Sequence, residues 1–194
     1  SPAIRSRNHD VPMIGGTAAR SGGIVDMGSL CHACHDEAMS DTFTALVLRE
    51  TDDGHVGALE QLTDADLPDG DVTVAVEYSS LNYKDGLALA GKNRIVRTYP
   101  MVPGIDLTGT VIASDSPHWQ VGDAVISTSF QVGERYWGGY TQRQRLHSEW
   151  LVRRPGSMSA RTAMAIGTAG LTAMLCVMEL EAAGVQPGDG PIVV

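Results

Sequence analysis

The chain has 194 residues, enough for one domain with a substantial core and part of a second. It carries 23 acidic and 14 basic residues, a formal net charge of −9, without a Lys/Arg block that would favour nucleic acid. Uninterrupted apolar runs are far shorter than the ~18 residues of a membrane span. Three cysteines make no disulfide framework, and no secretory h-region is visible, so we expect a cytoplasmic protein without a membrane or nucleic-acid partner.

Short strands separated by turns dominate the chain up to about residue 156. β-branched and apolar residues predict strands over 43–48, 72–78 with period two, 108–113, 124–127 and about 140–145. Turn residues lie between them at 52–54, 68–71 and 121–123. Residues 83–90 suit a short helix that ends at Gly91. Many short strands with glycine turns predict a compact, barrel-like β domain.

The pattern becomes helical from Ser157 onward. Ser159 is a candidate N-cap for a helix to about Ala165, and Gly167 interrupts the pattern. A second helix is predicted over 168–183, followed by Gly184 as its C-terminal cap. Apolar residues at i, i+3, i+4 and i+7 give this helix one apolar face, namely Leu171, Met174, Leu175 and Met178. An apolar run then begins at Pro191.

Four motifs occur in order along the chain. They are Leu81-Asn82-Tyr83-Lys84-Asp85, the stretch 100–106 with Pro103-Gly104-Ile105-Asp106, Trp137-Gly138-Gly139, and the stretch 167–174 that opens Gly167-Thr168-Ala169-Gly170. In this order and spacing they resemble the acrylyl-CoA reductase branch of the medium-chain dehydrogenase/reductase superfamily, a zinc-free branch often labelled quinone oxidoreductase. The similarity runs from about Thr42 to Val194.

The resemblance implies a mainly β fold with α: a GroES-like β barrel, followed by the truncated start of a Rossmann α/β domain. We expect a disordered extension over 1–38, the GroES-like substrate domain over 39–156, and the first helices and strand of a dinucleotide-binding domain over 157–194. No G-x-G-x-x-G turn occurs in the chain, and by resemblance it would follow Val194. The chain is therefore expected to be the N-terminal part of a longer enzyme, and by itself inactive.

The implied activity is NADPH-dependent reduction of an activated C=C bond, most specifically acrylyl-CoA to propionyl-CoA, by a homodimeric parent enzyme. A quinone or another enone is the alternative small-molecule substrate. Zinc-dependent relatives place Cys, His and Cys where this chain has Asn82, Ile105 and Thr168. Because a catalytic zinc needs about three such protein ligands, we expect no metal site.

Tyr83 is the main catalytic candidate. Reduction of an enoyl thioester builds negative charge on the thioester oxygen, and a phenol can donate a hydrogen bond to that oxygen. In the resembled family the matching tyrosine lies beside the nicotinamide, so Tyr83 is also a candidate cofactor contact. Two interpretations stay open for Asn82, which could orient substrate or cofactor, or cap the helix that follows. Lys84 and Asp85 fit a solvated helix face, with a phosphate of CoA as a weaker possibility for Lys84.

Thr168 follows a glycine at a predicted helix N-terminus, where unpaired N–H groups suit an anion or a carboxamide oxygen. In the resembled family this threonine faces the nicotinamide, and an ordinary N-cap is the compatible alternative. Cys31-His32-Ala33-Cys34-His35 matches the C-x-x-C-H pattern of haem attachment, which makes a haem-binding electron-transfer protein the alternative of another class. An unstructured tail explains the same residues.

Overall fold

The computed structural model describes residues 41–52 and 54–191. The chain divides into two units, residues 1–39 and 40–194, and all described residues belong to the second. The expected extension over 1–38, the Cys31–His35 motif and the last three residues of the apolar run lie outside the described residues. The predicted domain boundary between residues 156 and 157 stays a prediction.

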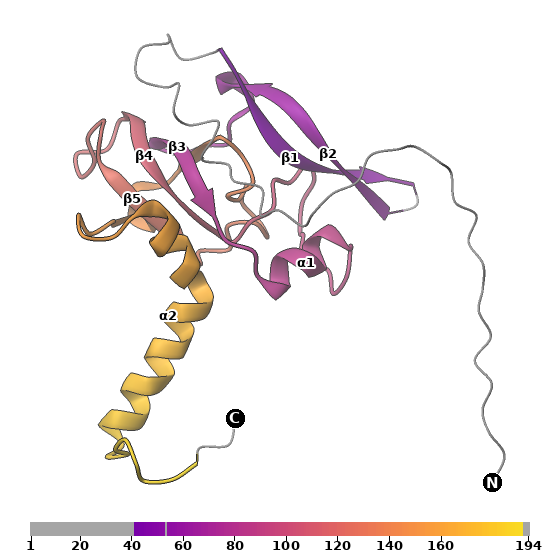
Figure 1. Cartoon of the computed structure of the whole chain (residues 1–194). Coiled ribbons are helices and arrows are strands. Elements are labelled where there is room, and N and C mark those ends of the chain that lie inside the picture. The colour runs from indigo at the N-terminus through magenta and orange to yellow at the C-terminus, as the bar shows by residue number, and fades with distance from the viewer. Residues whose placement is uncertain (1–40, 53, 192–194) are drawn as a thin grey trace, which may run out of the picture. The chain divides into compact units, whose positions relative to one another are not determined.

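The described unit is mainly β, with helices after the third strand and at its C-terminal end (Figure 1). Its strands are β1 (Thr42–Thr51), β2 (Gly54–Thr63), β3 (Val72–Ser79), β4 (Asp106–Ser114), β5 (Ala124–Thr128), β6 (Arg143–Leu146) and β7 (Val152–Arg153). Its helices are α1 (Tyr83–Leu89) and α2 (Ala160–Ala182), with 3₁₀ turns η2 (Asp64–Asp66) and η3 (Ser148–Trp150). The predicted fold class, β with α, is confirmed.

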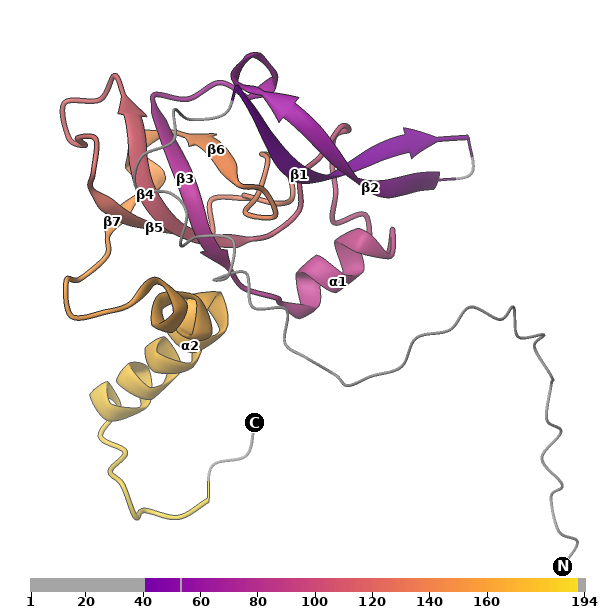
Figure 2. The same cartoon turned by 45° about the horizontal axis from the view of Figure 1, so that its top comes forward.

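The strands form two sheets. One has five antiparallel strands in the order β6-β3-β4-β5-β7, and the other is the β1–β2 hairpin. Isolated bridges connect β1 to neighbouring segments, from Ala45 to Thr141 and from Leu48 to Met101, so the hairpin lies beside the larger sheet (Figure 2). Within the described residues these strands make no single closed barrel. Strand β2 was not predicted, because most of its side chains are exposed and lack an apolar alternation.

Apolar side chains of the inner strands form the core of the larger sheet. Val72 and Val74 point to the same side of β3, as the period-two pattern predicts, and pack with Leu107 and Val111 of β4. These four side chains are fully buried. A second cluster lies under the hairpin and contains Phe43, Val47, Leu62 and Val102 among its members. The two clusters fix the strand ends that carry the polar residues described below.

The two glycine motifs lie against each other. The amide of Gly139 donates to the carbonyl of Gly104 at 2.8 Å, and that of Tyr140 donates to Pro103 at 2.9 Å. A Cβ atom at Gly138 would lie 2.2 Å from the Gly104 carbonyl oxygen, so no larger residue fits there. Because residues 137–142 pair with these segments, β6 begins only at Arg143, later than the predicted start.

Helix α2 has a break, as predicted. Ser159 accepts the amide of Thr162 at 3.1 Å and so caps the first turn. Gly167 has φ 48° and ψ −158°, which divides α2 into two helical segments. The first segment buries Ala160, Ala163 and Met164. Gly184, with φ 89°, follows the last turn, as expected for a C-terminal cap.

The second segment of α2, residues 168–182, leaves its apolar face uncovered. The exposed fractions are 44% for Leu171, 55% for Met174, 52% for Leu175 and 52% for Met178. Figures 1 and 2 show this segment extending away from the strands. The apolar face that the sequence predicts for this helix is therefore about half exposed within the described residues.

By length and composition alone, α2 could also cross a membrane, a weak criterion that core helices of soluble proteins satisfy as well. The sequence analysis considered only uninterrupted apolar runs, so it did not predict that α2 meets this criterion. Gly, Thr and Glu interrupt the apolar run in α2 but lower the mean hydropathy of the helix only slightly.

Candidate functional site

A buried carboxylate, Asp106, is the centre of a polar cluster at the start of β4. It is fully buried and accepts hydrogen bonds from Ser80 Oγ at 2.5 Å and Asn82 Nδ2 at 3.1 Å. Its other donors are the amide of Thr168 at 3.0 Å and the hydroxyl of the same residue. A buried charge is tolerated when such donors surround it. The carboxylate therefore ties the end of β3, the start of α1 and the second segment of α2 together.

Gly167 makes the approach of α2 to this carboxylate possible. A Cβ atom at this position would lie 2.8 Å from Asp106 Oδ2 and 3.3 Å from Ser80 Oγ. Its φ of 48° lies in the left-handed region, which is unfavourable for other residues. The glycine therefore both breaks the helix and turns the following threonine toward Asp106.

Asn82 directs its side-chain amide into the cluster. Its Nδ2 atom lies 2.8 Å from Ser80 Oγ, 3.1 Å from Asp106 Oδ2 and 3.2 Å from Asp85 Oδ2. Its backbone amide donates to Asp85 Oδ2 at 2.8 Å, the reciprocal contact of a helix N-terminus. Asn82 thus takes part both in the start of α1 and in the cluster around Asp106, and its role toward a ligand stays a prediction.

Asp85 is a correction to the sequence analysis, which took it for part of a solvated helix face. The side chain is only 1% exposed, and its Oδ1 accepts the amide of Ile105 at 3.0 Å. It therefore fixes α1 against the segment that leads into β4. Lys84 does point outward, and it pairs with Glu134 at 2.8 Å.

Tyr83 begins α1 and is 84% exposed. Within the described residues no hydrogen bond to its hydroxyl is found. The Tyr83 phenol is therefore accessible to a ligand. It lies next to the cluster around Asp106 but does not belong to that cluster. Its catalytic role, and its contact to a cofactor, stay predictions.

Thr168 differs in one respect from the expectation of an unpaired helix N-terminus. Its amide and its hydroxyl both donate to Asp106, so neither donor is available to an anion. Lone pairs of the hydroxyl oxygen remain and can accept a hydrogen bond, for example from the NH₂ of a carboxamide. The contact of Thr168 with a nicotinamide stays a prediction, and it would involve the hydroxyl oxygen as acceptor instead of the N–H group.

Tyr140 is a polar residue of the cluster that the sequence analysis missed. Its hydroxyl donates to the carbonyl of Ser80 at 3.2 Å. Burial, with the nearby carboxylates of Asp85 and Asp106 adding to it, raises the pKa of the phenol above its ordinary value. Tyr140 therefore remains a hydrogen-bond donor at neutral pH. It follows the predicted Trp137-Gly138-Gly139 motif directly, which was the available signal.

Two of the three positions that the resemblance compares with zinc ligands, Asn82 and Thr168, come together in the structure. Asn82 and Thr168 both contact Asp106, and the buried Ile105 precedes it in the chain. Among residues 41–52 and 54–191, no three His, Cys, Asp or Glu side chains are grouped as metal ligands. Asp106, which the sequence analysis named only as the end of the 100–106 motif, joins these segments through its hydrogen bonds to neutral partners. The absence of a metal stays a prediction.

Comparison with known proteins identifies similar chains. Residues 68–181 match the family model "Alcohol dehydrogenase GroES-like domain". The "Probable acrylyl-CoA reductase AcuI" of Escherichia coli is 52% identical over 150 residues, which cover 77% of this chain and 46% of that protein. The "Putative quinone oxidoreductase YhfP" of Bacillus subtilis is 40% identical over 156 residues, covering 80% of this chain and 47% of that protein.

A solved structure agrees with these relatives. The yhdH oxidoreductase of Salmonella enterica, crystallised in complex with NADP, has 52% sequence identity and a TM-score of 0.73. The match covers 76% of this chain and 45% of that structure. The chain thus spans about half the length of the proteins that it matches.

Proposed function

Because the chain belongs to the alcohol dehydrogenase GroES-like domain family, in its acrylyl-CoA reductase-like branch, we propose that the enzyme containing it reduces acrylyl-CoA to propionyl-CoA with NADPH. The observation that carries the proposal is the convergence of Asn82 and Thr168 on the buried Asp106, directly beside the exposed Tyr83. The name of the Escherichia coli relative and the NADP complex of the Salmonella enterica structure support the substrate and the cofactor.

The reaction adds a hydride and a proton across the C=C bond, which together amount to two electrons and two protons. NADPH, when bound, supplies a hydride to the β-carbon. The π electrons then move onto the thioester oxygen, and a proton added at the α-carbon restores the carbonyl. A hydrogen-bond donor held at that oxygen lowers the barrier, because it interacts most strongly when the charge has developed. Tyr83 is the accessible phenol that would donate there.

Thr168 and Asn82 have supporting roles in this proposal. The lone pairs of the Thr168 hydroxyl would accept the carboxamide NH₂ of the nicotinamide and so fix the orientation of its ring. Asn82 would hold the first turn of α1, and with it Tyr83, through its contacts to Asp85 and Asp106. Asp106 would keep the two residues at a constant separation. Positioning of this kind can contribute several kcal/mol to a reaction between two bound molecules.

The test is a substrate comparison in a full-length enzyme that contains this sequence. We expect NADPH oxidation with acrylyl-CoA to have a kcat/KM at least tenfold above that with a quinone. Equal or better turnover of a quinone would contradict the proposal.

A quinone or enone reductase is the second candidate, supported by the name of the Bacillus subtilis relative. The haem-binding alternative concerns Cys31–His35, outside the described residues, and absorbance near the Soret band would identify it. We further propose that the parent enzyme is a cytoplasmic homodimer. Light scattering at several concentrations would test the oligomeric state.

A further inference from the structure

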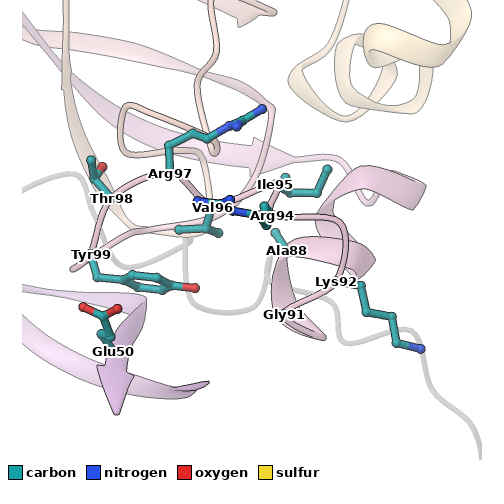
Figure 3. A pocket seen from close by; sticks show the side chains of 10 residues that line it. All are labelled: Glu50, Ala88, Gly91, Lys92, Arg94, Ile95, Val96, Arg97, Thr98 and Tyr99. Carbon is teal, nitrogen blue, oxygen red and sulfur yellow. The ribbon is translucent and has the colours of Figure 1, made fainter. Parts of the chain in front are cut away.

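A cavity separate from the Asp106 cluster lies at the C-terminal end of α1. Its volume is about 320 Å³, and its lining comprises Glu50, Ala88, Gly91, Lys92 and residues 94–99. Figure 3 shows Glu50 and Tyr99 on one side and Lys92 on the other, with Arg94 and Arg97 on the loop between them. Three cationic residues and one carboxylate are thus among its lining residues, and in Figure 3 the Lys92 and Arg97 side chains point away from Glu50 and Tyr99.

These three cations lack protein partners among the described residues. Arg49, Lys84, Arg143, Arg153 and Arg154 each form an ion pair with a carboxylate. Lys92, Arg94 and Arg97 form none within the part of the chain that the structure describes, and neither do Arg135, Arg145 and Arg161, but only the first three line the cavity. Since the whole chain has a net charge of −9, a local excess of cations is not a consequence of general composition. Such a cluster is a site of attraction for anions.

The loop that carries the cations is held in a fixed and costly conformation. Asn93 and Arg94 have φ angles of 57° and 48°, both in the left-handed region. Each such residue costs about 1–2 kcal/mol, and strain of this kind is concentrated at functional positions. The amide of Lys92 donates to Leu87 at 2.9 Å, and that of Arg97 donates to Glu134 at 2.9 Å. Both ends of the loop are therefore anchored, which sets the positions of the three cations.

The place of the cavity relative to Tyr83 suggests which anion it binds. Ala88 lines the cavity and Tyr83 begins the same helix, so five residues at 1.5 Å each separate them by about 8 Å along the helix axis. A coenzyme A thioester carries its phosphates at one end and its reacting acyl group at the other, on a long flexible arm. One such molecule could place its acyl group beside Tyr83 and its phosphates at Lys92, Arg94 and Arg97.

We propose that this cavity binds the phosphates of an acyl-CoA substrate through Lys92, Arg94 and Arg97; the assignment rests on the proposed function. The volume is at the lower end of the range for ligand sites and suits a phosphate-bearing portion rather than the whole molecule. The guanidinium groups present several donors to phosphate oxygens. The Glu50 carboxylate repels phosphate, so removal of its charge tests whether electrostatic attraction contributes to binding.

The experiment is calorimetric titration of coenzyme A into the 194-residue chain. We expect Arg94→Ala and Arg97→Ala each to weaken binding about tenfold, because each removes charge-assisted hydrogen bonds to phosphate. Glu50→Gln is expected to tighten binding, an effect in the opposite direction that damage to folding could not produce. Arg161→Ala, at an exposed arginine on α2 without an ion pair, is the matched control and is expected to leave binding unchanged.

Other ligands distinguish the sources of phosphate. Pantetheine, which has no phosphate, should bind without sensitivity to Arg94→Ala, and inorganic phosphate should bind far more weakly than coenzyme A. Equal affinity for inorganic phosphate and coenzyme A would overturn the assignment to the substrate. In a full-length enzyme, loss of NADPH binding in the arginine variants, with coenzyme A binding unaffected, would overturn it as well. So would a wild-type chain that does not bind coenzyme A.

Kinetics separate this inference from the proposed function. In a full-length enzyme, Arg94→Ala should raise the KM for acrylyl-CoA about tenfold and leave kcat nearly unchanged. Normal turnover with an unchanged KM would refute the phosphate site while the proposed function stands. An enzyme that does not reduce acrylyl-CoA, but whose coenzyme A binding still depends on Arg94, would refute the function and support the site.

Discussion

The cluster around Asp106 and the second segment of α2 meet at Thr168 and differ in their packing. Asp106 is fully buried and accepts hydrogen bonds from side chains and backbone of three different segments. From Leu171 to Met178, by contrast, large apolar side chains remain about half exposed. The comparison shows that the site geometry on the β side depends only on the described residues. The outer part of α2 keeps its helical backbone without tertiary support for its apolar face.

The largest expected effect concerns Tyr83, which belongs to neither of these two regions. Tyr83→Phe removes the hydroxyl and keeps the ring, and because the residue is 84% exposed the fold should not change. In a full-length enzyme we expect kcat to fall on the order of 10²-fold, the cost of losing one transition-state donor. Steady-state kinetics with acrylyl-CoA measure it. An unchanged kcat would make Tyr83 a residue without a catalytic role.

A second prediction tests the contrast in packing directly. Asp106→Asn replaces the charge that accepts four hydrogen bonds by a group that is partly a donor. We expect a loss of about 2–3 kcal/mol in the free energy of unfolding, measured by urea denaturation. Met174→Ala, on the exposed segment, should cost no more than about 0.5 kcal/mol. Similar losses for both variants would show that the two regions do not differ as described.

The third prediction concerns the apolar face of α2 in the chain by itself. An uncovered patch of this kind favours association, so light scattering should find oligomers or larger species. Changing Leu171, Met174 and Met178 to Gln should reduce that association without a change in the β domain. Because the glycine turn that holds a pyrophosphate is absent, we expect weak NADPH binding and no reductase turnover. A well-behaved monomer would contradict the first point, micromolar NADPH affinity the second, and measurable reductase turnover the third.

Tyr140 gives a smaller effect with a defined pH dependence. Its folded-state pKa lies above the ordinary value of about 10, so the folded state retains a proton that the unfolded state releases. The corresponding stability is fully present below pH ~10 and is lost as the pH rises further. Tyr140→Phe should flatten the stability profile above pH 10 and cost about 1 kcal/mol at neutral pH, since one hydrogen bond is removed. An identical slope in the variant and the parent chain would exclude Tyr140 as its cause.

We expect that removal of metal ions has no effect on activity. Asn82, Ile105 and Thr168 are not zinc ligands in these positions, so chelators should leave the activity of a full-length enzyme unchanged. Stoichiometric zinc in elemental analysis of the purified protein would disprove the expectation.

The strands and helices with a clear pattern could be predicted from the sequence. Alternation placed β3, and the glycines placed the break and the end of α2, because these signals depend on local conformational preference. The hairpin strand β2 could not be predicted, since an exposed strand has no buried face to impose a period.

The candidate site was only partly predictable. The motifs contain Asn82, Tyr83 and Thr168, but the burial of Asp85 and the central place of Asp106 depend on contacts between segments up to 62 residues apart. Sequence spacing along one helix says nothing about such contacts, so Asp85 was misjudged as a surface residue. The cavity with Arg94 and Arg97 was missed because unpaired cations differ from paired ones only in the folded chain.

The shared use of one carboxylate has a mechanical consequence. Thr168 at the start of the outer segment of α2 and Asn82 at the start of α1 bind the same Asp106, and the left-handed Gly167 provides a pivot between the halves of α2. If the second segment of α2 rotates about Gly167, either the hydrogen bonds to Asp106 lengthen or α1 moves with the segment. Tyr83, at the first turn of α1, would move with it, so a rotation of this segment would change the position of the exposed Tyr83 phenol.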